Sequence, residues 1–171
     1  KNAIKLHYCD FRDRQSVDSV IRQKLNDFDV IHHLAAQTYV PASFVAPQDT
    51  MENNVMGTLN LLESVRDNCP NAITHITGSS EEYGFVRPEE CPISEKNELR
   101  PMSPYGVSKV ACEMMAGQYY RSYGLKTIVT RGFNHSGRFR SLCFAESTFA
   151  KQVMERKLGL TLGPIKVGNL E

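Results

Sequence analysis

The chain has 171 residues, of which 41% are hydrophobic, 23% charged and 9% aromatic. This length and composition fit one globular domain with a real core and exclude a disordered or fibrous protein. The formal net charge is +1, so no broad electrostatic field would recruit nucleic acid or an anionic membrane surface. No apolar run approaches the roughly 20 residues that a transmembrane helix needs. We therefore expect a cytoplasmic protein without nucleic-acid or membrane partners.

Five cysteines are scattered through the chain, and no two of them form a C-x-x-C pair. An odd number without such pairs argues against a disulfide framework and against a zinc site. We expect free thiols, buried or partly buried in a reducing cytoplasm, and no bound metal.

Short apolar runs alternate with longer amphipathic stretches along the chain. The expected strands are 4–9, 29–36, 72–77 and 126–133, and the expected helices are 16–25, 48–68, 103–123 and 144–157. Ser103 can cap the third of these helices, Pro104 suits its first turn, and Gly124 ends it. This alternation predicts right-handed crossovers and a parallel sheet with helices on both faces.

Ligands of such sheets bind beyond the carboxyl ends of the strands. Polar or small residues stand at those ends: Asp10, Ala35, Ala36, Gln37, Ser79, Ser80, Glu81, Asn134 and His135. The polar stretch between Glu81 and Pro101 is too long for a simple turn, which predicts an ordered functional loop.

Tyr105 and Lys109 lie four residues apart on a predicted helix and therefore share one face. A tyrosine with a pKa of about 10 is a poor acid or base at neutral pH, and a neighbouring ammonium group would lower that pKa. Tyr-x-x-x-Lys also occurs by chance in many helices. The context favours a catalytic pair, because SPYGVSK opens a helix that follows a strand ending in Ser-Ser-Glu.

Ser79, Ser80 and Glu81 close the third expected strand. A serine hydroxyl there can hydrogen-bond a sugar oxygen as its charge changes, and a partly buried Glu81 could move a proton at carbon. The alternative is a strand end whose hydroxyls satisfy backbone groups, with Glu81 in solvent.

Other strand ends allow two interpretations each. Asp10 could accept a hydrogen bond from an adenine amino group, or it could shape the turn before the next helix. Leu34, Ala35 and Ala36 leave room for a cofactor, or they allow tight packing of helix on sheet. His135 could contact a cofactor or serve its loop.

His32 and His33 are neighbours in one expected strand, so their side chains point to opposite faces of the sheet. We interpret both as structural residues.

Seven motifs follow one another along the chain: CDFRD, HLAAQTYV, NNVMGTLNLLES, TGSSEEYG, RPMSPYGVSK, RGFNHSG and IKVGNLE. In this order they resemble the extended short-chain dehydrogenase/reductases that act on nucleotide sugars, over essentially the whole chain. They are most similar to the GDP-mannose branch, which includes the GDP-6-deoxy-4-keto-mannose reductases and the GDP-mannose 4,6-dehydratases.

The resemblance implies an α/β fold with a Rossmann-like, doubly wound parallel sheet. These residues contain no G-x-G-x-x-G phosphate loop, so we expect the fold to lack its first β-α-β unit. The sequence stops at Gly168-Asn169-Leu170-Glu171, so we also expect most of the C-terminal substrate domain to be absent. Residues 1–143 would form a partial NAD(P)-binding core with the catalytic residues, and 144–171 would begin the substrate-binding region.

The resemblance also implies roles for individual residues. Tyr105 would be the catalytic acid/base, Lys109 its partner and ribose ligand, and Glu81 would occupy the position of the dehydratases' general base. The implied catalytic residues are Ser79, Glu81, Tyr105 and Lys109. The implied cofactor-binding residues are Asp10, Phe11, Leu34, Ala35, Ala36, Tyr105, Lys109 and His135. The implied substrate-binding residues are Thr38, Ser79, Ser80, Glu81 and Asn134.

The activity that this resemblance implies is NADP(H)-dependent modification of a GDP-sugar, with NAD as the alternative cofactor. Reduction of GDP-4-keto-6-deoxy-mannose to GDP-rhamnose stands first and GDP-mannose 4,6-dehydration second. A UDP-sugar epimerase or decarboxylase and a truncated, non-catalytic binding module stay open. The two long helices 48–68 and 103–123 would pair across a homodimer as a four-helix bundle.

Overall fold

The computed structural model describes residues 4–23 and 28–168. The chain divides into two compact units, Lys1–Phe133 and Asn134–Glu171. The first unit holds the sheet, and the second holds one helix. The functional division into 1–143 and 144–171 stays a prediction.

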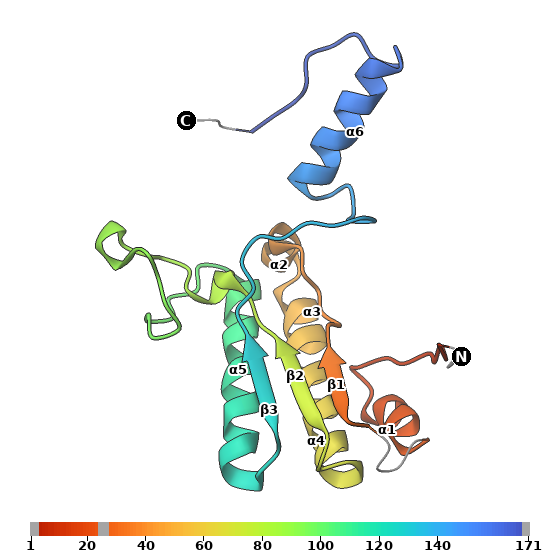
Figure 1. The fold of residues 1–171 in the computed structure, drawn as a ribbon, viewed down its shortest axis with the longest axis vertical. Coiled ribbons are helices and arrows are strands. Elements are labelled where there is room, and N and C mark those ends of the chain that lie inside the picture. Colours follow the sequence, from red (N-terminus) through yellow and green to blue (C-terminus); the bar gives the residue numbers. More distant parts are fainter. Residues whose placement is uncertain (1–3, 24–27, 169–171) are drawn as a thin grey trace. The chain divides into compact units, whose positions relative to one another are not determined.

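The first unit is built on a three-stranded parallel sheet (Figure 1). Its strands are β1 (Val30–His33), β2 (Ile73–Thr77) and β3 (Thr127–Thr130), in the spatial order β1-β2-β3. In this register His32 of β1 pairs with His75 of β2, which pairs with Ile128 of β3. Each crossover contains helices, so the predicted α/β, Rossmann-like parallel sheet is confirmed.

The helices follow the expected order. The chain runs through α1 (Arg14–Arg22), α2 (Val40–Val45), α3 (Pro47–Met51), a π-helical turn (Glu52–Met56), α4 (Gly57–Asn68), 3₁₀ turns at Ser80–Glu82 and Pro88–Glu90, α5 (Pro104–Tyr123) and α6 (Ala145–Lys157). The predicted caps of α5 are confirmed, because the Ser103 hydroxyl accepts from the Gly106 N–H and Gly124 ends the helix in the left-handed region.

Two predictions about the elements need correction. The expected strand 4–9 does not form: within the described residues it has no ladder partner, and Leu6 is 92% exposed. An extended segment becomes a strand only when a neighbour pairs with its backbone groups. The expected single helix 48–68 is a succession of α3, a π-helical turn and α4, and α2 was not predicted.

The hydrophobic core lies between the sheet and the helices on one of its faces (Figure 1). It joins Ile76 of β2 to Leu62 and Val65 of α4 and to Cys112 and Ala116 of α5. Each of these side chains is at most 2% exposed. The core therefore fixes α4 and α5 against the strands whose carboxyl ends carry the predicted site.

The two adjacent histidines point to opposite faces, as predicted. His33 is buried and its Nε2 hydrogen-bonds Thr58 Oγ1 at 3.1 Å. His32 is exposed and its Nδ1 lies 3.1 Å from Nδ1 of His75 on the neighbouring strand.

Within the second unit, Gln152 of α6 holds the segment that follows the helix. Its side chain accepts from the Lys166 N–H at 2.7 Å and donates to the Lys166 carbonyl at 3.1 Å. None of the described helices is both long enough and apolar enough to cross a bilayer.

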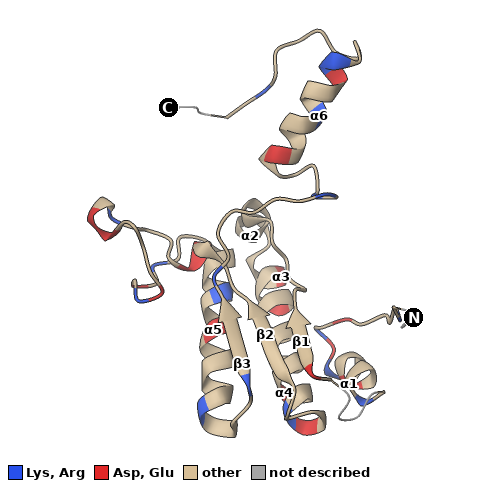
Figure 2. Cartoon of the chain, in the orientation of Figure 1, with Lys and Arg blue, Asp and Glu red and all other residues tan. Residues whose placement is uncertain are grey.

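Charges and thiols fit the sequence analysis in part. Basic and acidic residues are interspersed along the ribbon (Figure 2), in keeping with the formal net charge of +1.

All five cysteines are free thiols. Cys69 and Cys112 are buried as expected, whereas Cys91 and Cys143 are exposed, contrary to expectation.

Candidate active site

The site begins where β2 ends in Gly78 and Ser79. The Gly78 N–H donates to the Thr130 carbonyl at 2.7 Å, so the turn stays close to β3. A Cβ on Gly78 would lie 2.4 Å from Glu82 Oε1 and 2.8 Å from the Thr130 carbonyl oxygen. Ser79 then caps the 3₁₀ turn, and its Oγ accepts from the Glu81 N–H at 3.2 Å. The lack of a side chain at Gly78 therefore lets the chain turn tightly and present Ser79.

The first turn of α5 packs directly against this serine turn. A Cβ on Gly106 would lie 2.7 Å from the Glu81 carbonyl oxygen, so glycine permits the close approach. This contact brings Tyr105, which is 7% exposed, to the end of β2. The Ser79 hydroxyl lies close enough to the Tyr105 phenol to lower its pKa. The structure thus brings together the two side chains that the enzymatic interpretation needs side by side.

Lys109 lies one turn farther along α5 and is 6% exposed. Its Nζ donates to the Thr77 carbonyl at 2.7 Å and lies 5.9 Å from the centroid of the Tyr105 ring. Burial lowers the pKa of Lys109. Lys109, Tyr105 and Ser79 therefore meet at the carboxyl end of β2, as sequence reasoning predicted.

The electrostatics of Tyr105 differ from the expectation. Burial raises the pKa of Tyr105, the Ser79 hydroxyl opposes that rise, and the charges of Glu81 and Glu82 add to it. Lys109, which was expected to lower this pKa, is not among the groups that shift it. The raised pKa keeps the Tyr105 phenol protonated at neutral pH.

Ser80, Glu81 and Thr38 were predicted to meet a sugar nucleotide. Ser80 is half-buried and its N–H donates to the Gly132 carbonyl at 2.9 Å. The Glu81 and Thr38 residues are exposed. Exposure leaves both side chains open to a ligand, and their roles stay predictions.

Asn54 is a site residue that sequence reasoning missed. It lies in the π-helical turn, is 1% exposed, and accepts from the Gln37 N–H at 2.8 Å. Its Nδ2 donates to the Gln37 carbonyl at 3.1 Å and to Ser108 Oγ at 2.9 Å. Asn54 thus ties the segment after β1 to α5, beside Lys109. A buried asparagine inside an apolar helix was the available signal, and π-turns are frequent at functional sites.

Four of the eight predicted cofactor-binding residues line one cavity. Asp10, Phe11, Ala35 and Ala36 contribute to a cavity of about 400 Å³. The carboxylate of Asp10 is held by Arg12, whose Nη2 donates to Oδ2 at 2.8 Å. Hydrogen bonds from Arg12 lower the pKa of Asp10 to about 2.

Three other predicted contacts lie elsewhere. Leu34 is 68% exposed and lines a neighbouring cavity of about 440 Å³. Asn134 and His135 open the second unit, and their contacts with the site stay predictions.

Comparison with known proteins gives the same picture. The family model for GDP-mannose 4,6 dehydratase matches residues 1–171. GDP-6-deoxy-D-mannose reductase from Pseudomonas aeruginosa is 35% identical over 143 residues, which are 84% of this chain and 47% of that protein. GDP-mannose 4,6 dehydratase 1 from Arabidopsis thaliana is 36% identical over 174 residues, covering 98% of this chain and 44% of that protein.

A solved structure agrees as well. The structure of RMD from Pseudomonas aeruginosa complexed with NADPH superimposes with a TM-score of 0.85 at 33% identity, over 91% of this chain and 52% of that one. The chain spans about half the length of the relatives that it matches. The match along all 171 residues, together with the Ser79–Tyr105–Lys109 geometry, shows that the chain belongs to the GDP-mannose 4,6-dehydratase family of extended short-chain dehydrogenase/reductases.

Proposed function

We propose that the protein containing this chain modifies a GDP-sugar with NADP(H), and that its reaction is the reduction of GDP-4-keto-6-deoxy-mannose to GDP-rhamnose. The observation that carries this proposal is the buried Tyr105 phenol beside Ser79 and Lys109 at the carboxyl end of β2, where burial raises the pKa of the phenol. Reduction of a ketone needs a proton for the oxygen, and a neutral phenol whose pKa is raised holds one at neutral pH.

Ser79, Tyr105 and Lys109 would each have a different role in that reaction. Ser79 would hydrogen-bond the keto oxygen and stabilise the charge that develops there. Tyr105 would donate its proton to the same oxygen, and the Lys109 ammonium, 5.9 Å from the centroid of the Tyr105 ring, would lie beside the phenolate that results. Lys109 can also hold ribose hydroxyls with the ammonium protons that the Thr77 carbonyl does not accept.

The cavity lined by Asp10, Phe11, Ala35 and Ala36 could hold part of a dinucleotide cofactor. It lies at the carboxyl end of β1, where parallel sheets bind nucleotides, and the small side chains of Ala35 and Ala36 let a ligand approach the backbone. NADPH bound there would supply the hydride for the reduction. The P. aeruginosa neighbour is complexed with NADPH, which supports this cofactor, and other solved neighbours are complexed with NAD, which stays the alternative.

Dehydration of GDP-mannose is the second candidate. It is favoured by Glu81, an exposed carboxylate next to the Ser79 turn that could remove a proton at carbon. Supplying GDP-mannose with NADP⁺ should then yield a 4-keto-6-deoxy sugar. Absence of that product, with consumption of the keto sugar in the presence of NADPH, supports reduction instead. Competition between GDP- and UDP-sugars would expose a UDP-sugar epimerase or decarboxylase.

A non-catalytic binding module is the alternative from another class. Equilibrium binding of NADPH and of a GDP-sugar distinguishes this alternative from an enzyme: a folded protein that binds neither would contradict the enzymatic proposal.

We further propose that the enzyme works as a homodimer in the cytoplasm. Exposed apolar side chains on α5, Val107 and Met114, and Met56 ahead of α4 support pairing of these helices across a dimer. A monomeric mass at micromolar concentration would contradict it.

A further inference from the structure

Glu82 is a fully buried carboxyl group immediately beside the proposed catalytic serine. It is 0% exposed. Its Oε1 accepts from the Ser79 N–H at 2.7 Å. The Ser79 hydroxyl in turn accepts from the Glu81 N–H and caps the start of the same 3₁₀ turn. One oxygen of Glu82 therefore fixes the backbone of Ser79 directly.

The other oxygen of Glu82 lacks a hydrogen-bond donor. Oε2 is buried, and no described residue donates to it. Arg131 comes nearest, with Nε at 3.7 Å, but four of its five N–H donors are used elsewhere. Nε and Nη2 donate to Glu113 at 2.7 and 2.5 Å, and Nη1 donates to the Tyr83 hydroxyl at 3.1 Å and the Glu95 carbonyl at 3.0 Å.

One guanidinium group thus faces two carboxyl groups in a buried cluster. If both carboxyls were ionised, the cluster would carry an uncompensated negative charge, which is costly away from water. A proton on Glu82 removes that charge and turns Oε2 into a donor toward Glu113. Two carboxyl groups that share a buried site commonly share one proton.

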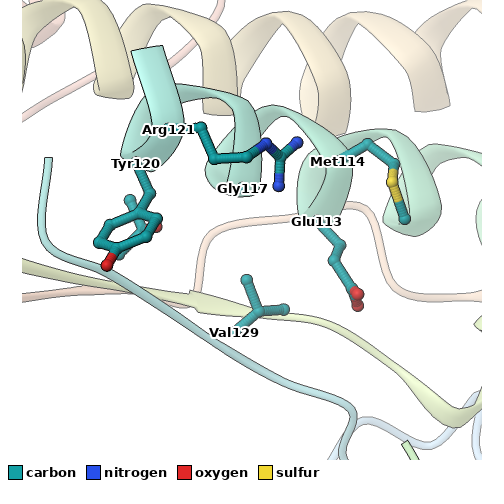
Figure 3. Close-up of a pocket in the computed structure, with 7 residues that line it drawn as sticks. Glu113, Met114, Gly117, Tyr120, Arg121 and Val129 are labelled. Carbon is teal, nitrogen blue, oxygen red and sulfur yellow. The ribbon is translucent and has the colours of Figure 1, made fainter. Parts of the chain in front are cut away.

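The surroundings decide which carboxyl holds the proton. Glu113 receives both branches of the Arg131 fork, keeps 18% of its side chain exposed and lines a cavity of about 300 Å³ between α5 and β3 (Figure 3). Glu82 is fully buried and receives no such pair of hydrogen bonds from Arg131. Burial and the contact with Glu113 raise the pKa of Glu82 to about 7, whereas Arg131 lowers the pKa of Glu113.

We propose that Glu82 is a positioning residue that, as a neutral carboxylic acid, donates its proton to Glu113, accepts from the Ser79 N–H, and so holds Ser79 against Tyr105. The effect of Glu82 on turnover rests on the proposed reductase function. The protonation of Glu82 and its hydrogen bond with the Ser79 N–H do not. The charged and titratable groups around it are Glu113, Lys109, Tyr105 and Cys112 of α5, Arg131 after β3, and Tyr83, which follows its own turn.

Isotope-edited infrared spectroscopy of glutamate-labelled protein tests the protonation. At about pH 6, below the raised pKa of Glu82, the protein should show the carbonyl band of a protonated carboxylic acid. Glu82→Gln should abolish that band, and Glu113→Gln should too, because Arg131 could then pair with an ionised Glu82. No band in the native protein, or a band that survives in Glu82→Gln, overturns the proposal.

Hydrogen exchange at the Ser79 amide tests the positioning without any turnover. Glu82→Gln keeps an acceptor for Ser79 and a donor for Glu113, so protection of this amide should persist. Glu82→Leu has similar volume but no acceptor and should lose it by tenfold or more. Protection that persists in a folded Glu82→Leu variant contradicts the positioning role.

Turnover then links this role to the proposed function. Glu82→Gln should retain reduction of the keto sugar and Glu82→Leu should lose most of kcat. If the native protein reduces no GDP-keto sugar, the proposed function fails, while the infrared and exchange results still decide the state of Glu82.

The pH dependence of stability gives a further readout with a definite sign. Because the pKa of Glu82 is raised from 4.5 in the unfolded chain to about 7 in the folded protein, folding takes up a proton between these two pH values. Its contribution to stability is complete below about pH 4.5 and is lost as the pH rises through about 7. Buried His33 titrates in an overlapping range with the opposite sign, so the difference between the native protein and Glu82→Gln is the quantity to measure. A difference that does not fall between these pH values contradicts the proposal.

Discussion

Lys109 donates a hydrogen bond from Nζ to the backbone carbonyl of Thr77 at 2.7 Å. This bond ties the second turn of α5 to the end of β2, two residues before Ser79. The same α5 turn carries Ser108, whose Oγ donates to the Tyr105 carbonyl at 2.7 Å and accepts from Asn54. A buried ammonium group therefore serves both the architecture of the site and its proposed chemistry.

Replacing Lys109 by methionine tests separately its contribution to the stability of the fold and its contribution to NADPH binding. Lys109→Met leaves the Thr77 carbonyl unpaired, which costs on the order of 1–3 kcal/mol, partly offset because a buried charge no longer has to be desolvated. NADPH affinity should fall, since the proposed ribose ligand is lost. Urea unfolding and NADPH titration measure the two effects. Lys151→Met, which removes a surface pair with Glu155, is the control and should change stability by no more than about 0.5 kcal/mol. Unchanged NADPH affinity in Lys109→Met would contradict the ribose role.

Tyr105→Phe tests the proton donor. Loss of a positioned acid lowers turnover by roughly 10²- to 10⁴-fold, while NADPH affinity should stay near that of the native protein. The rate of NADPH consumption with the GDP-keto sugar measures the first, and a binding titration measures the second. Tyr120→Phe, at an exposed tyrosine on the same helix, should keep full activity. If Tyr105→Phe keeps it as well, the proton comes from another group.

His33 predicts an acid-sensitive stability. Burial, with a smaller effect of Lys109, lowers the pKa of His33 from 6.5 to about 4, so the unfolded chain binds a proton that the folded chain does not. The contribution of His33 is complete above about pH 6.5 and is lost as the pH falls toward about 4; it amounts to at most about 3 kcal/mol.

The free energy of unfolding measured from pH 7 to pH 4.5 checks this effect. His33→Gln should flatten the acid side of the curve, and His32→Gln, at the exposed neighbour, should leave its shape unchanged. Equal curves for the native protein and His33→Gln would rule out titration of His33 as the cause.

Gly78→Ala tests the tight turn that presents Ser79. The added methyl group would lie 2.4 Å from Glu82 Oε1 and 2.8 Å from the Thr130 carbonyl oxygen, so side chain or backbone must shift, at a cost of about 1–3 kcal/mol. Thermal unfolding should show a lower Tm and the keto-sugar assay a lower kcat. Gly137→Ala has no atom within 4 Å of the added methyl and is the matched control. A native Tm for Gly78→Ala would show that the turn relaxes without strain.

Local patterns in the sequence fix much of this protein. Apolar periodicity locates the three strands of the sheet and the long helices, because burial on one face demands a repeat of about 3.6 residues in a helix. Ser103 and Gly124 mark the ends of α5, because caps act on neighbouring backbone groups. The four-residue spacing of Tyr105 and Lys109 likewise places both side chains on one helix face.

Tertiary structure decides what depends on contacts between distant segments. The extended residues 4–9 are not a strand, since strand formation requires a hydrogen-bonded neighbour. Of two adjacent glutamates, Glu82 is buried under Ser79 and Glu81 is exposed. The 3₁₀ turn and the proximity of Glu82 to Arg131 determine which of the two is buried. Sequence periodicity could indicate Tyr105 and Ser79 as candidates, but only the packing of α5 on the end of β2 brings them together, because no local rule fixes a distance across two crossing elements.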